Sequence, residues 1–332
     1  MALSDSVILC ECWARDGLQS MPHVVSTEHK LEMITNILES GVQKLEVTSF
    51  SHPKLLPQFA DAEEVLRRMP RPKGVSTVVL MPNERGFDRF ERCQEEGYGA
   101  DEIILMISAS EAHNLANFRM NHDHAKRVHA GIMARALGLG VKVIGCAGTV
   151  YGCPIAGEVA FEDVADLVRF YVDHGAATIM LGDTTGAANP LLVRERIGAL
   201  RELFPEVEFI AHFHETRGTG IVNTFAALEL GLRYVDASLG AIGGQPATSS
   251  NRYQHGFTGN VSTEDLVCML EECGVHTGLD LERLLENGRR AEDILDQRLL
   301  ERDRLRPREP RTSGLRAADV RSDSGRVHPR VR

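Results

Sequence analysis

Two histidines stand two residues apart at the end of an apolar run in the second half of the chain. The run begins at Phe209 and reads Phe-Ile-Ala-His-Phe-His, which makes the histidines His212 and His214. Such a run is typical of a buried β-strand, in which alternate side chains point to the same face. Both imidazoles then project from one strand end and supply half of a divalent-metal site. The alternative for an isolated His-x-His is a hydrogen-bonded pair that binds no metal.

A carboxylate that would complete such a site occurs near the start of the chain. Arg15 and Asp16 follow the apolar run of residues 7–12. Asp16 and the two histidines form a His₂-carboxylate set, which suits Mg²⁺, Mn²⁺ or Zn²⁺ when water fills the remaining positions. Arg15 would lie beside the cation, where a guanidinium stabilises an enolate or carbonyl oxygen. Taken alone, the Arg-Asp pair is also typical of a surface turn.

Further polar side chains follow or end other apolar runs. They are Glu46, Thr48, Ser108, Ser110, Asp183 and Thr184. In a barrel of parallel strands, functional groups gather where the strands end, so these residues are candidates for the same site. Asp183 lies in Gly-Asp-Thr-Thr-Gly, where the alternative to a functional role is an aspartate that caps a turn.

The elements that must position these residues form one alternating series. Eight apolar runs of strand length are each followed by a segment with helical periodicity. The predicted strands cover residues 7–12, 44–49, 75–80, 102–108, 141–146, 177–181, 209–214 and 234–239. The predicted helices cover residues 27–41, 62–69, 85–96, 123–137, 161–174, 190–203, 221–230 and 263–273.

This series predicts an α/β fold, a (β/α)₈ TIM barrel, rather than two doubly wound halves. Apolar positions within residues 279–299 predict extra C-terminal helices packed against the barrel. No Gly-x-Gly-x-x-Gly follows the first run and no P-loop occurs in the sequence, which argues against the common nucleotide-binding folds.

The charge is unevenly distributed along the 332 residues. The net charge of −10 argues against a nucleic-acid-binding protein. Between Arg302 and Arg332 ten arginines face four acidic residues, so this tail carries +6 and residues 1–301 carry −16. The tail lacks apolar periodicity and is expected to be disordered. We therefore predict a catalytic barrel domain with its C-terminal helices over residues 1–300 and a basic tail over residues 301–332.

The seven cysteines are scattered and form no Cys-x-x-Cys pair. No secretory or transit segment precedes the first strand, and the apolar runs are far too short to span a membrane. These features predict a reduced cytoplasmic protein with free thiols and no membrane partner.

Several motifs together resemble the hydroxymethylglutaryl-CoA lyase family, and the resemblance extends from residue 7 to about residue 290. They occur in the family's order and spacing. The motifs are Arg-Asp-Gly-Leu-Gln from Arg15, Leu-Glu-Val-Thr-Ser-Phe from Leu45, Leu-Gly-Asp-Thr-Thr-Gly from Leu181, His-Phe-His-Glu-Thr from His212, Gly-Asn from Gly259, Thr-Glu-Asp-Leu-Val from Thr263 and Val-His-Thr-Gly from Val275.

The resemblance implies a site and a reaction. Divalent-cation ligands would be Asp16, His212, His214 and the amide oxygen of Asn260, and His212 would also belong to the catalytic set. Arg15 would hold the carbonyl that becomes the enolate, while Glu46 and Asp183 would orient the metal ligands. The cation would be Mg²⁺ or Mn²⁺, with Zn²⁺ as an alternative. The reaction implied is retro-aldol (retro-Claisen) cleavage of an acyl-CoA thioester to acetyl-CoA and an oxo acid, in a homodimer or higher homo-oligomer.

The chain departs from the family pattern at the loop that normally carries a catalytic cysteine. Where the family has Gly-Gly-Cys-Pro, this chain has Gly-Gly-Gln-Pro, with Gln245 in place of the thiol. An amide does not exchange protons near neutral pH as a thiol does. Tyr253 and His255 are candidate acids in its place, and Arg252 is a candidate contact for a carboxylate or phosphate. The alternative for all three is an exposed lid.

A second departure is Ser-Met-Pro from Ser20, where the family usually has Asn-Glu-Lys. Both departures leave the predicted metal ligands intact, and they motivate a substrate related to 3-hydroxy-3-methylglutaryl-CoA, such as citramalyl-CoA. Two other functions are compatible with the motifs. One is an aldolase or Claisen synthase that acts on a 2-oxo or hydroxy acid without CoA. The other is a catalytically silent metal-binding barrel that serves as an interaction partner.

Overall fold

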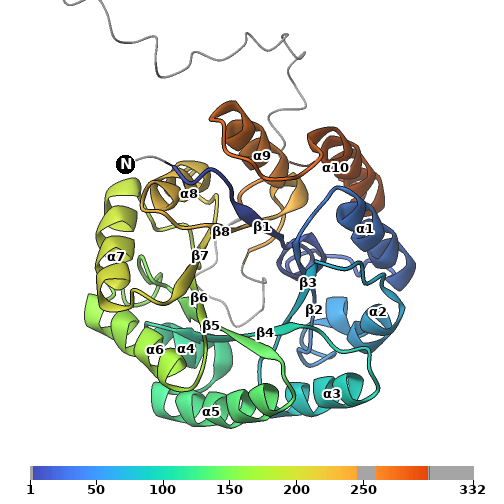
Figure 1. The fold of residues 1–332 in the computed structure, drawn as a ribbon. Coiled ribbons are helices and arrows are strands. Elements are labelled where there is room, and N and C mark those ends of the chain that lie inside the picture. Colours follow the sequence, from blue (N-terminus) through green and yellow to red (C-terminus); the bar gives the residue numbers. More distant parts are fainter. Residues whose placement is uncertain (1–2, 245–258, 298, 300–332) are drawn as a thin grey trace, which may run out of the picture.

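The computed structural model describes residues 3–244, 259–297 and 299, which form a closed barrel of eight parallel strands surrounded by helices (Figure 1). Each strand pairs with its neighbours in sequence, and the last strand closes the barrel against the first. This confirms the predicted (β/α)₈ TIM barrel. The strands are β1 (Ile8–Glu11), β2 (Lys44–Ser49), β3 (Ser76–Leu80), β4 (Glu102–Ser108), β5 (Lys142–Gly148), β6 (Thr178–Asp183), β7 (Glu208–Phe213) and β8 (Tyr234–Ala237).

The helices cover the outside of the barrel, and several begin at the residues that local sequence signals indicate. The side chain of Ser26 caps the first helix by accepting a hydrogen bond from the His29 N–H, and Asn189 caps the seventh, whose first residue is Pro190. The helices are α1 (Thr27–Glu39), α2 (Ala62–Arg68), α3 (Glu84–Glu95), α4 (Glu111–Phe118), α5 (His122–Gly138), α6 (Phe161–Asp173), α7 (Pro190–Leu203), α8 (Gly220–Glu229), α9 (Thr263–Glu272) and α10 (Leu281–Leu295).

Two helices, α4 and α10, differ from the predicted elements. The sequence did not predict α4, a short helix between β4 and α5 that is capped by Ser110. The apolar pattern of residues 279–299 forms the single helix α10, which packs against α1 and α9 at the outside of the barrel (Figure 1). Within the described residues, no helix has the length and apolar character that crossing a membrane requires. The predicted basic tail, residues 301–332, lies outside the described residues.

The apolar core has two parts, because alternate residues of each strand face opposite sides of the barrel wall. One part fills the space between the strands and the helices. The other lies inside the barrel and consists of Val78, Ile104, Ile144, Cys146, Met180 and Ile210. The interior is therefore packed rather than open, and the polar inward-facing side chains described below lie toward the carboxyl ends of the strands.

Candidate metal-dependent active site

The site begins at a tight turn that follows β1. Trp13–Gly17 form one π-helical turn in which all five residues are buried, and the indole of Trp13 is fully inaccessible to solvent. Such turns are rare and recur at functional sites. The turn carries Arg15 and Asp16 on consecutive residues, and both side chains remain within the site rather than in solvent.

The two predicted histidines converge as the strand pattern requires. His212 in β7 and His214 directly after it have their Nε2 atoms 3.2 Å apart. The Nδ1 atom of His212 lies 3.0 Å from Asp236 Oδ2, and that of His214 lies 2.8 Å from the Thr184 carbonyl oxygen. Because each Nδ1 faces an oxygen acceptor, it carries the ring proton, and the two Nε2 lone pairs face the same point. A cation bound there satisfies both rings, so the donor set fits a metal ion.

Asp16 is the third member of this cluster. One ligand atom from each of Asp16, His212 and His214 lies within 4.8 Å of the others, and all three residues are buried. Asp16 Oδ2 lies 3.7 Å from His214 Nε2. Burial alone would raise the pKa of Asp16, but the charge of Arg15 and the nearby histidines lower it far below its ordinary value. Asp16 is therefore an anion, as a ligand for a divalent cation must be.

The environment of His212 also favours positive charge at this point. Burial by itself would lower the pKa of His212, but the hydrogen bond that it donates to Asp236 and the charges of Asp236 and Asp16 raise it above the ordinary value. A site that favours a protonated imidazole also favours a bound cation, since both place positive charge between the same carboxylates.

Arg15 supplies a fixed positive charge beside the cluster. Its Nε lies 2.5 Å from Glu46 Oε1 and its Nη1 lies 2.7 Å from Asp16 Oδ1. Burial would lower the pKa of Arg15, but the charges of Glu46 and Asp16 raise it, so the guanidinium stays charged. Burial raises the pKa of Glu46 and the charge of Arg15 opposes that rise. Glu46 thus holds Arg15 and does not touch the histidines through any described hydrogen bond.

Asn260 lies next to the cluster, although its oxygen is not the atom that faces it. Its Nδ2 donates hydrogen bonds to Asp16 Oδ2 at 2.7 Å and to the Ile242 carbonyl oxygen at 2.9 Å. Asn260 also pairs with His214 through a β-bridge. The structure therefore brings Asn260 to Asp16 as a hydrogen-bond donor, and metal ligation by its amide oxygen stays a prediction.

Asp183 contacts the backbone of its own loop. Its Oδ1 accepts hydrogen bonds from the backbone N–H groups of Ala187 at 2.7 Å and Ala188 at 3.2 Å. It caps the loop after β6 and makes no described hydrogen bond to a histidine, and its role in orienting the metal ligands stays a prediction. Its influence on the site passes through Thr184, the next residue, whose carbonyl oxygen fixes the ring of His214.

Asp236 and Gln19, which no sequence pattern singled out as site residues, complete the site. Asp236 in β8 accepts from His212, and Gln19 hydrogen-bonds through its Nε2 to Asp16 Oδ1 and to the Gly244 carbonyl oxygen. A signal for Asp236 was present, since it is the one acid in the run Tyr-Val-Asp-Ala-Ser-Leu. Gln19 lay within a family motif, but nothing local showed that its amide reaches Asp16.

Some predicted residues do not contact the cluster of Asp16, His212 and His214 through any described hydrogen bond. Ser108 hydrogen-bonds His113 through its hydroxyl, 2.6 Å from Nδ1, and Ser110 caps α4. Gln245, Arg252, Tyr253 and His255 lie outside the described residues. The described site is therefore a buried His₂-carboxylate cluster with a guanidinium beside it, which can bind a divalent cation and stabilise a developing oxyanion.

Comparison with known proteins decides the family. A model of the family described as HMGL-like matches residues 6–290, which contain every residue of the cluster. The chain belongs to the HMGL-like family. A hydroxymethylglutaryl-CoA lyase of Bacillus subtilis is 35% identical over 303 residues, which are 91% of this chain and 98% of that protein. The human mitochondrial hydroxymethylglutaryl-CoA lyase is 34% identical over 286 residues, or 86% of this chain and 85% of that protein.

A solved structure of an HMGL-like relative agrees with this assignment. The HMG-CoA lyase from Acinetobacter baumannii, in complex with coenzyme A and 3-methylmalate, matches with a TM-score of 0.83 and 36% identity. The match covers 91% of this chain and 95% of that one. The resemblance that the sequence motifs indicated is confirmed over nearly the whole HMGL-like barrel.

Proposed function

We propose that this HMGL-like protein cleaves a 3-hydroxy-3-methylglutaryl-CoA-like thioester to acetyl-CoA and an oxo acid, in a reaction that depends on a divalent cation. As a member of its family the chain is a carbon–carbon lyase. The observation that carries the proposal is the cluster of Asp16, His212 and His214 within 4.8 Å, beside a buried guanidinium. The bound coenzyme A in the Acinetobacter relative supports a CoA thioester as the substrate class.

Asp16, His212 and His214 would hold the cation, with Asn260 as the proposed fourth ligand. Two imidazoles and a carboxylate can bind Mg²⁺, Mn²⁺ or Zn²⁺. We assign Mg²⁺ or Mn²⁺ to the site, with Zn²⁺ as the alternative. When bound, the cation supplies Lewis-acid polarisation of the substrate's oxygen atoms. The protein fixes the ligand rings beforehand, through Asp236 on His212 and the Thr184 carbonyl oxygen on His214.

Arg15 stabilises the negative charge that develops when the carbon–carbon bond breaks. A base takes the substrate's hydroxyl proton, the oxygen forms the carbonyl of the oxo acid, and the carbon–carbon bond breaks with its electron pair left on the thioester fragment as an enolate. The guanidinium of Arg15 is held in place by Glu46 and Asp16, so it does not need to reorganise when this negative charge develops. Glu46 is a positioning residue for Arg15, and Asp183 positions the loop that orients His214.

The enolate carbon must then receive a proton. Gln245 stands where the family has its loop cysteine, and an amide does not donate a proton near neutral pH. We assign this step to Tyr253 or His255 of the same loop. The altered loop also motivates a substrate such as citramalyl-CoA in place of the parent thioester. A cytoplasmic location and a homodimer or larger homo-oligomer complete the proposal.

The test follows acetyl-CoA release by mass spectrometry. The purified protein is incubated with Mn²⁺ or Mg²⁺ and hydroxymethylglutaryl-CoA, then with citramalyl-CoA, and His212→Ala is the blank. Release from the first thioester supports the proposal and means that Gln245 is compatible with turnover. Release from citramalyl-CoA alone means that the loop has changed the specificity.

Failure of both thioesters would contradict the proposal when metal binding is intact. A parallel assay with free 2-oxo and hydroxy acids then separates the CoA-independent aldolase from the silent barrel, since only the aldolase yields a product. His124→Ala is the matched control, because this histidine belongs to a second His-x-His in α5 and lies outside the cluster. Its turnover should equal that of the unmodified protein.

A further inference from the structure

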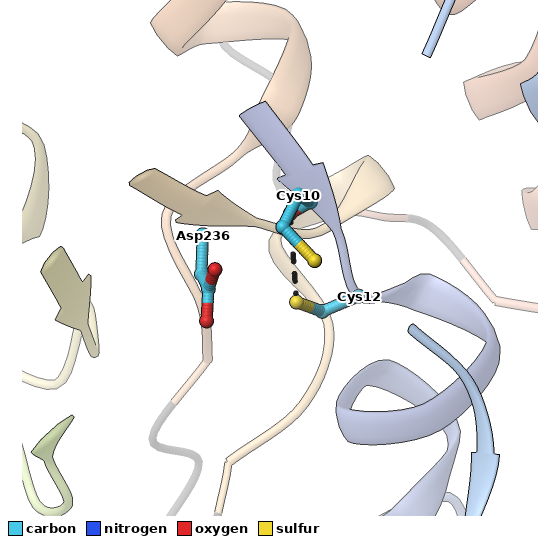
Figure 2. Close-up of side chains that lie close together, drawn as sticks. All are labelled: Cys10, Cys12 and Asp236. Atoms are coloured by element: carbon cyan, nitrogen blue, oxygen red, sulfur yellow. Dashed lines mark hydrogen bonds between the residues drawn. The ribbon is translucent and has the colours of Figure 1, made fainter. Parts of the chain in front are cut away.

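Two cysteines and a carboxylate meet inside the barrel, next to the site described above. Cys10 in β1, Cys12 directly after it and Asp236 in β8 have one ligand atom each within 4.8 Å of the others. All three residues are at most 3% exposed. Figure 2 shows the two sulfur atoms close together, with the Asp236 side chain beside them on the neighbouring strand.

The local backbone explains why these side chains meet. Cys10 and Cys12 are two residues apart, so a continuing strand would place both on the inner face. Cys12 follows the strand with φ −109° and ψ 4°, and its Sγ lies 3.5 Å from the Cys10 carbonyl oxygen. Cys10 is the register partner of Asp236 in the β1–β8 pair, which brings the carboxylate alongside the thiols.

One atom of this cluster has no partner. Asp236 Oδ2 accepts from His212 Nδ1, whereas Asp236 Oδ1 is buried without a hydrogen-bond partner among the described residues. Buried carboxylate oxygens are normally hydrogen-bonded or bind a cation, because an unsatisfied one is costly. Two packed thiols alone would be the ordinary inert cysteines of a core. The unpartnered oxygen beside them is an independent indication that a ligand belongs there.

We propose that Cys10, Cys12 and Asp236 form a second cation site, which takes a thiophilic divalent ion of the Zn²⁺ or Cd²⁺ class. Two sulfur atoms and one carboxylate oxygen are a typical zinc-type donor set, and they leave a fourth position for water. The sulfur–metal distance is about 2.3 Å, so two sulfur ligands of one tetrahedral ion lie about 3.8 Å apart. The observed upper limit of 4.8 Å requires only small side-chain adjustments.

The binding step balances in charge. Each thiol releases its proton to solvent as its sulfur binds, and the two thiolates with the carboxylate then face the divalent ion. No oxidant or reductant takes part. The donor set differs from the cluster of Asp16, His212 and His214, which has no sulfur and suits harder ions. Asp236 connects the two sites, because one oxygen contacts His212 and the other is free for the second ion.

The test uses Cd²⁺, whose bonds to thiolates give an ultraviolet charge-transfer band. The reduced full chain is incubated with Cd²⁺ in excess Mg²⁺, for long enough to load a buried site, and the bound metal is counted. We expect one thiolate-bound Cd²⁺ per chain. The variant Cys10→Ala/Cys12→Ala should lose the band, while Cys93→Ala/Cys273→Ala, which removes as many thiols elsewhere, should keep it.

Two further measurements keep the result interpretable. Asp16→Asn should retain the band, because Asp16 belongs only to the other site. X-ray absorption of the Zn²⁺-loaded wild-type protein should show sulfur ligands at about 2.3 Å beside nitrogen and oxygen ligands, and this measurement does not depend on any variant folding. An absorption spectrum with only nitrogen and oxygen ligands, or a band that survives in Cys10→Ala/Cys12→Ala, would overturn the proposal. None of these readouts depends on the proposed lyase activity.

Discussion

Asp236 is the residue whose replacement tests the architecture of the metal centre most directly. Asp236→Asn removes the negative charge that faces His212 Nδ1 but keeps an oxygen that accepts its hydrogen bond. Asp236→Ala removes both. Neither change touches Asp16 or His214 through a described hydrogen bond, so the effect on metal affinity passes through the orientation and charge of one imidazole ring.

The size of the effect follows from the contact. The Nδ1–Oδ2 distance is 3.0 Å, and the two side chains are 9% and 2% exposed, so the interaction is hardly screened by water. A hydrogen bond to a charged group contributes about 1.5–3 kcal/mol and a neutral one about 1 kcal/mol. We therefore expect Mn²⁺ binding to weaken by about 2-fold to 30-fold in Asp236→Asn, and by about 10-fold to 150-fold in Asp236→Ala.

The assay is calorimetric titration of the metal-free protein with Mn²⁺. Glu102→Gln is the control, because it makes the same carboxylate-to-amide change at the other end of the barrel, where Glu102 pairs with Lys44 at 2.7 Å. That variant should melt at a lower temperature yet bind Mn²⁺ as the unmodified protein does. An Asp236→Ala affinity within about threefold of the unmodified protein would refute the role of Asp236 in orienting His212.

Three further predictions concern neighbouring residues. Burial raises the pKa of Glu11 from 4.5 to about 7, so this group contributes about 3 kcal/mol of stability that is present at low pH and lost as the pH rises through that window. The free energy of unfolding in urea should therefore change less between low and high pH in Glu11→Gln than in the unmodified protein, and an equal change in both would contradict the assignment. Gly243→Ala should abolish Mn²⁺ binding in calorimetry, since the residue has φ +121° and its new Cβ would collide with Asn260 Nδ2. Gly74→Ala, at φ +86° with open space around it, should cost only about 1–2 kcal/mol of backbone strain. Arg15→Lys should reduce acetyl-CoA release at least about 100-fold, because one ammonium cannot replace the guanidinium held by both Glu46 and Asp16; near-normal turnover would exclude the proposed role.

Much of the fold was predictable because parallel strands buried on both faces are nearly continuous apolar runs. The observed β2 and β4 have the predicted bounds, and α7 begins at Pro190 as its Asn-Pro signal indicates. The boundaries that moved lie where an apolar pattern gives no stop signal. For example, β6 continues to Asp183, because the backbone pairing with β7 extends beyond the last apolar side chain.

The convergence of the cluster was predictable only in part. His212 and His214 share a face because strand alternation is a local property of the chain. That Asp16 meets them depended on the barrel closing between β1 and β8, which the alternating series predicted and the pairing of those strands confirmed. The sequence left two interpretations of Asp183 open, a contact that orients the metal ligands and a turn cap. In the structure its carboxylate accepts hydrogen bonds from two backbone N–H groups of its own loop.

The sequence by itself determined the barrel, the family and the residue types of the metal cluster, because periodicity and short motifs are local and persist in the unfolded chain. Only the tertiary structure decided which oxygen each imidazole contacts, that Asn260 presents its nitrogen to Asp16, and that Asp236 lies between His212 and the thiols of Cys10 and Cys12. Those contacts join residues more than twenty positions apart, and they depend on strand register and side-chain rotamers that arise when the barrel closes.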